Sequence, residues 1–145
     1  MLGTHLLKHW ACTQKRITLS SGEAELGAIV RGLSEVLGIH SVARDLGVEL
    51  QPEVHADSSA AIGICRRSGI GKVRHLAVAQ WVQDLVRSRE VRVHKVLGTE
   101  NPADLMTKPL ARAEIDGHLG RLGLSRATGR AETARVCVCA CVRVC

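Results

Sequence analysis

The sequence predicts an α/β fold in which helices pack on a small sheet. A long apolar pattern with helical period covers residues 26–40, and a short strand-like segment at 52–56 leads into a helix start, as does another at 91–97. A strand followed directly by a helix is the repeating unit of layered α/β folds. With 145 residues and 46% hydrophobic content, the chain suits one domain with one core.

The first elements in chain order are a hairpin and a long helix. Residues 1–10 and 16–19 are short apolar stretches separated by a polar one, which predicts two strands. Ser20 and Glu23 form a capping-box pattern, in which a serine oxygen accepts from a free backbone N–H and Glu23 reaches back. Gly47 supplies the stop of this helix. Its buried face is expected to carry Leu26, Ile29, Val30, Leu33, Val36, Leu37 and His40.

The next elements are a strand, a helix and a basic loop. Residues 52–56 form a strand candidate, and residues 57–59 cap a helix that continues through 60–65. Residues 66–74 contain two glycines among arginines and a lysine, which is typical of a loop.

A second strand and two further helices follow this loop. Residues 75–89 predict an amphipathic helix, and residues 91–97 are β-branched and alternate as a strand does. Asn101 as N-cap and Pro102 at the first helical position predict another helix start. Asp104 is therefore expected in the first turn of that helix.

Composition restricts the possible partners. A formal charge of +6 and a pI near 9.3 favour an acidic partner such as nucleic acid, although much of the excess charge lies near the C-terminus. Trp10 and Trp81 are the only aromatic residues, so Trp81 is expected in the core and stacking on bases is nearly excluded. No apolar run approaches the roughly 20 residues of a membrane span, and the start lacks a secretory pattern. These features predict a soluble, intracellular protein.

Four of the six cysteines lie close together near the C-terminus, at Cys137, Cys139, Cys141 and Cys145. Alternate spacing is wrong for a tetrahedral zinc site, which usually takes pairs separated by two to four residues. A zinc-binding or partner-binding arm is therefore the less favoured hypothesis. Residues 125–145 are interpreted as a low-complexity tail that is disordered, and residues 1–124 as the domain.

Three carboxylates stand in settings that suit a two-metal phosphodiester site: Glu25 near a helix start, Asp57 at a strand end and Asp104 near another helix start. Taken singly, each also has the simpler role of a capping or first-turn acid. Taken with their flanking residues, they favour a nuclease-like domain.

Those flanking residues resemble the ribonuclease H domain of copia-type retrotransposon Pol polyproteins. The combination of motifs is specific, correctly ordered and covers about residues 1–124. The motifs are Leu-Ser-Ser-Gly-Glu-Ala-Glu-Leu at 19–26, Ala-Asp-Ser-Ser-Ala-Ala-Ile at 56–62, Arg-His-Leu at 74–76 and Glu-Asn-Pro-Ala-Asp-Leu-Met-Thr-Lys-Pro-Leu at 100–110.

The resemblance implies a ribonuclease H-like mixed sheet flanked by helices, and cleavage of the RNA strand of RNA–DNA hybrids by two metal ions. Glu25, Asp57 and Asp104 match the family's metal ligands and catalytic carboxylates, so Mg²⁺, or Mn²⁺ in its place, is the implied cofactor. The implied partners are the hybrid and the upstream reverse transcriptase portion, in a cytoplasmic particle and not at a membrane.

Nucleic-acid contacts are expected from two kinds of residue. Ser21 and Ser58 could donate to phosphate, although helix capping alone explains them and is the favoured role. Lys72 and Arg74 could contact phosphate, although a basic loop is as often only a solvated connection.

The chain departs from the family pattern in three places, one of which is that the loop histidine of cellular relatives has no counterpart between Gly98 and Pro102. The first strand, with its leading aspartate, is expected before Met1, which suggests an N-terminally truncated domain, and Ala77 replaces a usual acid. The sequence therefore predicts a nuclease domain whose activity is impaired in this chain. The alternative is an inactive element remnant with weak nucleic-acid binding.

Overall fold

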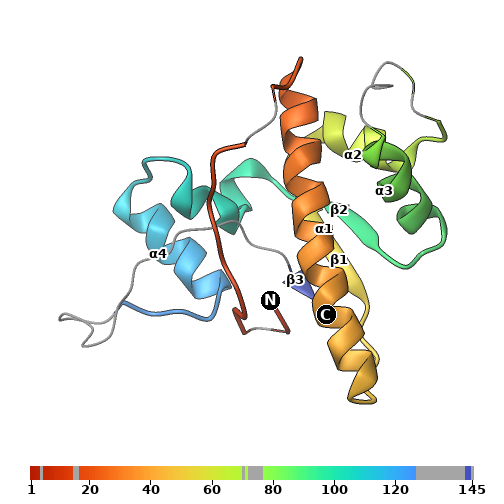
Figure 1. Cartoon of the computed structure of the whole chain (residues 1–145). Coiled ribbons are helices and arrows are strands. Elements are labelled where there is room, and N and C mark those ends of the chain that lie inside the picture. The colour runs from red at the N-terminus through yellow and green to blue at the C-terminus, as the bar shows by residue number, and fades with distance from the viewer. Residues whose placement is uncertain (4, 15–16, 70, 72–76, 127–142, 145) are drawn as a thin grey trace.

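The computed structural model describes residues 1–3, 5–14, 17–69, 71, 77–126 and 143–144. Within them the fold is mixed α/β, which confirms the predicted class. Figure 1 shows α1 running the length of the molecule, with α2 and α3 on one side of it and α4 on the other. The helices are α1 (Ser21–Asp45), α2 (Ser59–Arg66), α3 (Val78–Arg87) and α4 (Arg112–Arg121), and two 3₁₀ helices, η2 (Gly98–Glu100) and η3 (Pro102–Met106), precede α4.

The sheet is small and mixed. Strand β1 (Pro52–Ala56) pairs in parallel with β2 (Arg92–Lys95) and antiparallel with the two-residue β3 (Arg143–Val144), in the order β2-β1-β3. Residues of β1 alternate between buried and partly buried, so one face of the sheet contributes to the core. The other face carries the stacked rings of His55 and His94, whose centroids lie 5.1 Å apart.

Helix α1 has the ends that its sequence predicts. Ser20 Oγ accepts a hydrogen bond from Glu23 N at 3.3 Å, and Glu23 Oε2 accepts one from Leu19 N at 2.9 Å. At the other end Gly47 adopts φ +75°, and Val48 N donates to Ala43 O, which is the Schellman arrangement. Two sets of local contacts therefore fix where this helix begins and ends.

One apolar cluster holds α1, α2, α3, β1 and β2 together. It draws mainly on aliphatic side chains, as expected for a chain with two aromatic residues. Burial of the apolar surface of these side chains supplies most of the stability of the fold. The cluster contains Leu26, Ile29, Leu33, Val54, Ala56, Ala61, Ile62, Cys65, Ala79, Val82, Leu85, Val91 and Val93.

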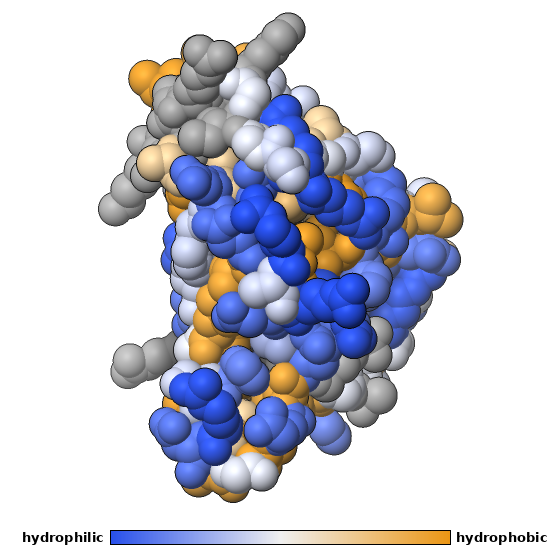
Figure 2. Space-filling view, turned by 90° about the vertical axis from the view of Figure 1, so that its right-hand side faces the viewer, coloured by the Kyte–Doolittle hydropathy of each residue, from blue (hydrophilic) through white to orange (hydrophobic). Residues whose placement is uncertain are grey.

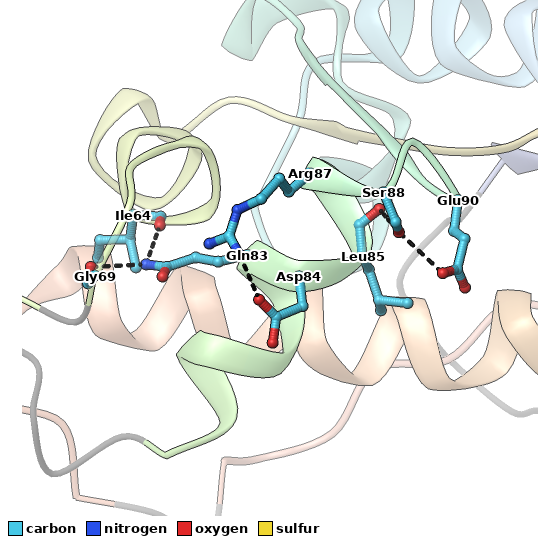
Figure 3. Close-up of polar contacts among 8 residues, drawn as sticks. All are labelled: Ile64, Gly69, Gln83, Asp84, Leu85, Arg87, Ser88 and Glu90. Atoms are coloured by element: carbon cyan, nitrogen blue, oxygen red, sulfur yellow. Dashed lines mark hydrogen bonds and ion pairs between the residues drawn. The ribbon is translucent and has the colours of Figure 1, made fainter.

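A buried glutamine joins α3 to the end of α2. Gln83 is only 2% exposed, and its Nε2 donates to Ile64 O at 2.9 Å and to Gly69 O at 3.0 Å (Figure 3). Its Oε1 is buried, and no described residue donates to it. The amide thus anchors the chain that leaves α2, at the expense of one acceptor without a partner.

The structure corrects three expectations. The hairpin is wrong, since the described residues of 1–19 form only an isolated bridge between Leu2 and His5. Trp81 is not a core residue but 38% exposed. The face of the molecule drawn in Figure 2 is largely hydrophilic, with hydrophobic residues scattered over it. The helix expected after Asn101 is the short 3₁₀ helix η3. The ribonuclease H-like arrangement and the boundary between residues 124 and 125 stay predictions.

In the part of the chain that the structure describes, α1 alone is long and apolar enough to cross a membrane. Its residues Leu26, Leu33 and Val36 are almost fully buried in the protein. Only 28% of the apolar window of this helix is buried in the described structure. The expectation that no apolar run approaches the length of a membrane span is therefore wrong for this helix by length and composition.

Candidate metal and nucleic-acid site

The N-termini of α1 and α2 meet at a glycine. A Cβ placed on Gly22 would lie 3.0 Å from Ala60 Cβ, a distance that real Cβ atoms rarely reach. The absence of a side chain therefore lets the two helix ends approach closely. Asp57 stands just before the α2 N-cap Ser58, and Glu25 lies one turn into α1, so this contact holds both carboxylates on one side of the fold.

A cavity of about 710 Å³ lies between the N-terminal segment, the start of α1 and η3. Glu25, Asp57 and Asp104 all line it, although the first and the last of them lie 79 positions apart in the sequence. Asp104 is held there because Asn101 caps η3, with its Oδ1 accepting from Ala103 N at 3.2 Å. The structure thus brings the three predicted carboxylates to one cavity.

The charges around this cavity influence one another. Partial burial raises the pKa of Glu25, and the neighbouring carboxylates of Asp57 and Asp104 raise it further, while Lys108 opposes them. Asp104 is 9% exposed, and its Oδ2 lies 2.8 Å from Lys108 Nζ. This hydrogen bond and the Asp104 charge raise the pKa of Lys108, with smaller contributions from Asp57 and Glu25.

The donors fit Mg²⁺ in kind, because carboxylate oxygens are the hard ligands that this ion prefers. Their placement is more open than a metal centre requires. Among the described residues, no group of three or more His, Cys, Asp or Glu side chains is arranged to hold an ion. A cation would therefore need the carboxylates to close around it.

Of the four predicted nucleic-acid contacts, the two described ones, Ser21 and Ser58, do not line the cavity. Ser21 is the first residue of α1 and is exposed. Ser58 caps α2, its Oγ accepting from Ala61 N at 3.2 Å, so the simpler role is present. Lys72 and Arg74 lie outside the described residues.

Sequence reasoning missed Trp10, Arg31 and Lys108, which line the same cavity. Arg31 Nη1 lies 2.8 Å from Cys12 Sγ, and its guanidinium carbon lies 5.9 Å from the centre of the Trp10 ring. Lys108 is the third. Only Lys108 had a local signal, since residues four apart on one helical turn face each other and Asp104 precedes it by four.

The class of protein that the chain resembles is the retrovirus-related Pol polyprotein of plant transposons. It is 29% identical over 129 residues to the Pol polyprotein from transposon RE1 of Arabidopsis thaliana, a match that covers 86% of this chain. It is 28% identical over 127 residues, 85% of the chain, to that from transposon RE2 of the same plant. The Pol polyprotein from transposon TNT 1-94 of Nicotiana tabacum is 29% identical over 106 residues, 71% of the chain.

The chain spans only about 8–9% of the length of these curated relatives. No family model matches it, and no solved structure matches it significantly. The comparisons therefore relate the chain to a transposon-derived polyprotein region.

Proposed function

We propose that this chain is a ribonuclease H-like region of a copia-type retrotransposon Pol polyprotein, and that it acts on the RNA strand of RNA–DNA hybrids. One observation carries the proposal: three carboxylates from distant parts of the sequence line a single cavity. The similarity to transposon Pol polyproteins supports it, because reverse transcription makes such hybrids. The motifs around Glu25, Asp57 and Asp104 supply the link to this activity.

The proposed cofactor is Mg²⁺, which Mn²⁺ could replace. Glu25, Asp57 and Asp104 would hold it through carboxylate oxygens. Bound metal would supply an activated water and stabilisation of the leaving oxygen. Burial, and after it the neighbouring carboxylates of Asp57 and Asp104, raise the pKa of Glu25, so a bound cation would favour its ionised form.

The proposed partners are the hybrid and the reverse transcriptase portion of the same polyprotein, in a cytoplasmic particle. Hybrid recognition would rest on backbone charge and shape, because the chain has a formal charge of +6 and almost no aromatic side chains for stacking. Ser21, Ser58, Lys72 and Arg74 are the proposed phosphate contacts.

The second candidate is an inactive remnant that binds nucleic acid weakly. The observation in its favour is the open arrangement of the carboxylates, which forms no group of three able to hold an ion among the described residues. Hybrid binding without cleavage would distinguish this candidate from the first.

The test is cleavage of a labelled RNA–DNA hybrid with Mg²⁺ or Mn²⁺, together with hybrid binding by fluorescence anisotropy. Asp57→Asn is expected to abolish cleavage. Asp84→Asn is the matched control, because Asp84 is exposed on α3 and paired with Arg87 outside the cavity. Cleavage that survives Asp57→Asn would reject the site, and binding without cleavage would favour the remnant. Absence of both would reject both functions.

A further inference from the structure

The N-terminal segment forms one wall of the cavity by lying along α1. Lys8 Nζ pairs with Glu35 Oε2 at 2.5 Å, and Gln14 Nε2 donates to Ala24 O at 2.6 Å. Residue 8 thus meets a later turn of α1 than residue 14 does, so the segment runs antiparallel to the helix (Figure 1). These two contacts fix the ends of the wall, and residues 10–14 line the cavity.

Arg31 lies between these two contacts and joins α1 to the wall. Its guanidinium carbon lies 5.9 Å from the centre of the Trp10 ring, and its Nη1 lies 2.8 Å from Cys12 Sγ. All three residues line the cavity. A planar guanidinium is stabilised over an aromatic face, so Trp10 restricts the directions in which its N–H groups point. Arg31 is exposed to solvent, yet its head group has a preferred position at the cavity.

The charge of Arg31 is not paired with a carboxylate in the described part of the chain. Arg87, by contrast, pairs with Asp84 at 3.0 Å, and Arg92 pairs with Glu53 at 3.4 Å. The contact that Arg31 does make is with a thiol, which is a weak acceptor, and a guanidinium carries five N–H donors. Arginine binds phosphate through two parallel hydrogen bonds of this kind. The side chain is therefore equipped to bind a phosphate group.

Arg31 lies apart from the acidic end of the cavity. It follows Glu25 by six residues on the same helix, which places the two about 9 Å apart along the helix axis. Asp57 and Asp104 both raise the pKa of Glu25, after burial, so the three acids gather at that end. A rise of about 9 Å corresponds to two or three nucleotides of a duplex, at about 3.4 Å each. A strand that meets the carboxylates would therefore bring a neighbouring phosphate to the guanidinium.

We propose that Arg31, held in place by Trp10, binds a backbone phosphate of a nucleic-acid strand, two or three nucleotides from the position that faces the carboxylates. This inference rests on the proposed function, which makes that strand part of an RNA–DNA hybrid. Arg31 is the residue that touches the nucleic acid, and Trp10 is a positioning residue that acts through it. Because the contact is to phosphate, it adds affinity without base preference.

Binding of a fluorescent RNA–DNA hybrid to the full chain, measured by anisotropy in EDTA at several salt concentrations, tests the contact. Arg31→Gln is expected to weaken binding about tenfold or more, the usual effect of losing a hydrogen bond to a charged group. The logarithm of the binding constant should also fall less steeply with that of the salt concentration, by about 0.7–0.9 for one lost phosphate contact. Arg31→Lys keeps the charge and should keep this slope, with a smaller loss of affinity.

Arg87→Gln is the matched control, because Arg87 is on α3, paired with Asp84, and does not line the cavity. It removes the same net charge and should leave affinity and salt slope nearly unchanged. Thermal unfolding of each variant checks that it is folded. Equal affinity of Arg31→Gln and the unchanged chain would overturn the proposal. So would an equal loss in Arg87→Gln, or a hybrid that the unchanged chain does not bind.

A double-mutant cycle separates the positioning role of Trp10 from a structural one. Trp10→Leu should weaken binding in the unchanged chain but have little further effect once Arg31→Gln is present, because the ring acts through the guanidinium. Trp10→Phe keeps an aromatic face and should restore most of the affinity. Additive losses from Trp10→Leu and Arg31→Gln would overturn the role given to Trp10.

The outcome is separable from hybrid cleavage. Binding that depends on Arg31, with no cleavage by any variant in Mg²⁺ or Mn²⁺, would support the phosphate contact and reject the nuclease. Cleavage that Asp57→Asn abolishes, with binding that Arg31→Gln leaves unchanged, would support the nuclease and overturn the contact.

Discussion

The two sides of the molecule are held together in different ways. On one side α1, α2, α3, β1 and β2 share a single apolar cluster. On the other side, the N-terminal segment, η3 and α4 bury few described residues, among them Met1, His118 and Leu122, none of which joins that cluster. Glu25 and Asp57 belong to the first side and Asp104 to the second. Two carboxylates are thus fixed by the core, whereas the third depends on local contacts.

Leu33→Ala is expected to cause the largest loss in the free energy of unfolding among the changes that compare the two sides. Leu33 is fully buried in the core cluster, so its truncation is expected to cost about 2–5 kcal/mol in the free energy of unfolding. Leu122→Ala, at a residue 3% exposed beside α4, should cost less because it lies outside the cluster. Urea denaturation measures both, and equal losses would show that the two sides are one cooperative core.

Gly22→Ala tests the close contact that places Glu25 near Asp57. The added methyl would meet Ala60 Cβ at 3.0 Å, and the resulting strain is expected to cost about 1–3 kcal/mol. Gly38→Ala is the control on the same helix, where no atom lies within 4 Å. That change should stabilise the protein by about 0.5–1 kcal/mol. Thermal unfolding measures the stability of both variants. If both were more stable than the unchanged chain, the close contact between Gly22 and Ala60 would be contradicted.

Gln83→Met tests the polar anchor within the packed side. Methionine keeps the length but loses two donors, leaving Ile64 O and Gly69 O to find other partners. A loss of about 1–2 kcal/mol is expected, reduced by removal of the buried Oε1. Gln80→Met, at an exposed position of α3, should be nearly neutral in the same urea titration. If the two variants were equally stable, the anchor would contribute nothing.

The smallest effect on stability near neutral pH is expected from the cysteines, of which Cys12 and Cys65 are compared by their rates of alkylation. Burial raises the pKa of Cys65 from an ordinary 9.0 to about 11, whereas Cys12 is exposed beside the cavity. A pulse of iodoacetamide with peptide mapping should label Cys12 much faster. Since the folded thiol resists ionisation, its contribution to stability is complete below pH 9 and is lost as pH rises towards 11. Equal labelling of Cys12 and Cys65 in the native chain would place Cys65 outside the core.

Elements with their own local signals were predictable from sequence. Helix α1 has its cap at Ser20 and its stop at Gly47, and α2 has Ser58, so both were assigned before any tertiary contact was known. The hairpin failed because Ile17 and Leu19 are 97% and 79% exposed in the structure, so their apolar character does not report burial. No helical signal could separate a 3₁₀ helix from an α-helix after Asn101.

The site was predictable in its residues but not in its balance of charge. Motifs indicated Glu25, Asp57 and Asp104, and the structure brings all three to one cavity. Arg31 and Trp10 were missed because their contacts join segments that sequence patterns cannot relate. The ion pair between Lys108 and Asp104 can be established only from side-chain positions, which the sequence does not give.

The shortage of aromatic residues has an optical consequence. The chain has no Tyr or Phe, so its near-ultraviolet fluorescence comes from two indoles alone. Trp10 lines the cavity under Arg31, and Trp81 lies on α3 away from it. A chain carrying Trp81→Leu would emit from the cavity wall only. Such a chain would report cation or nucleic-acid entry as a change in a single emission band, without an attached dye.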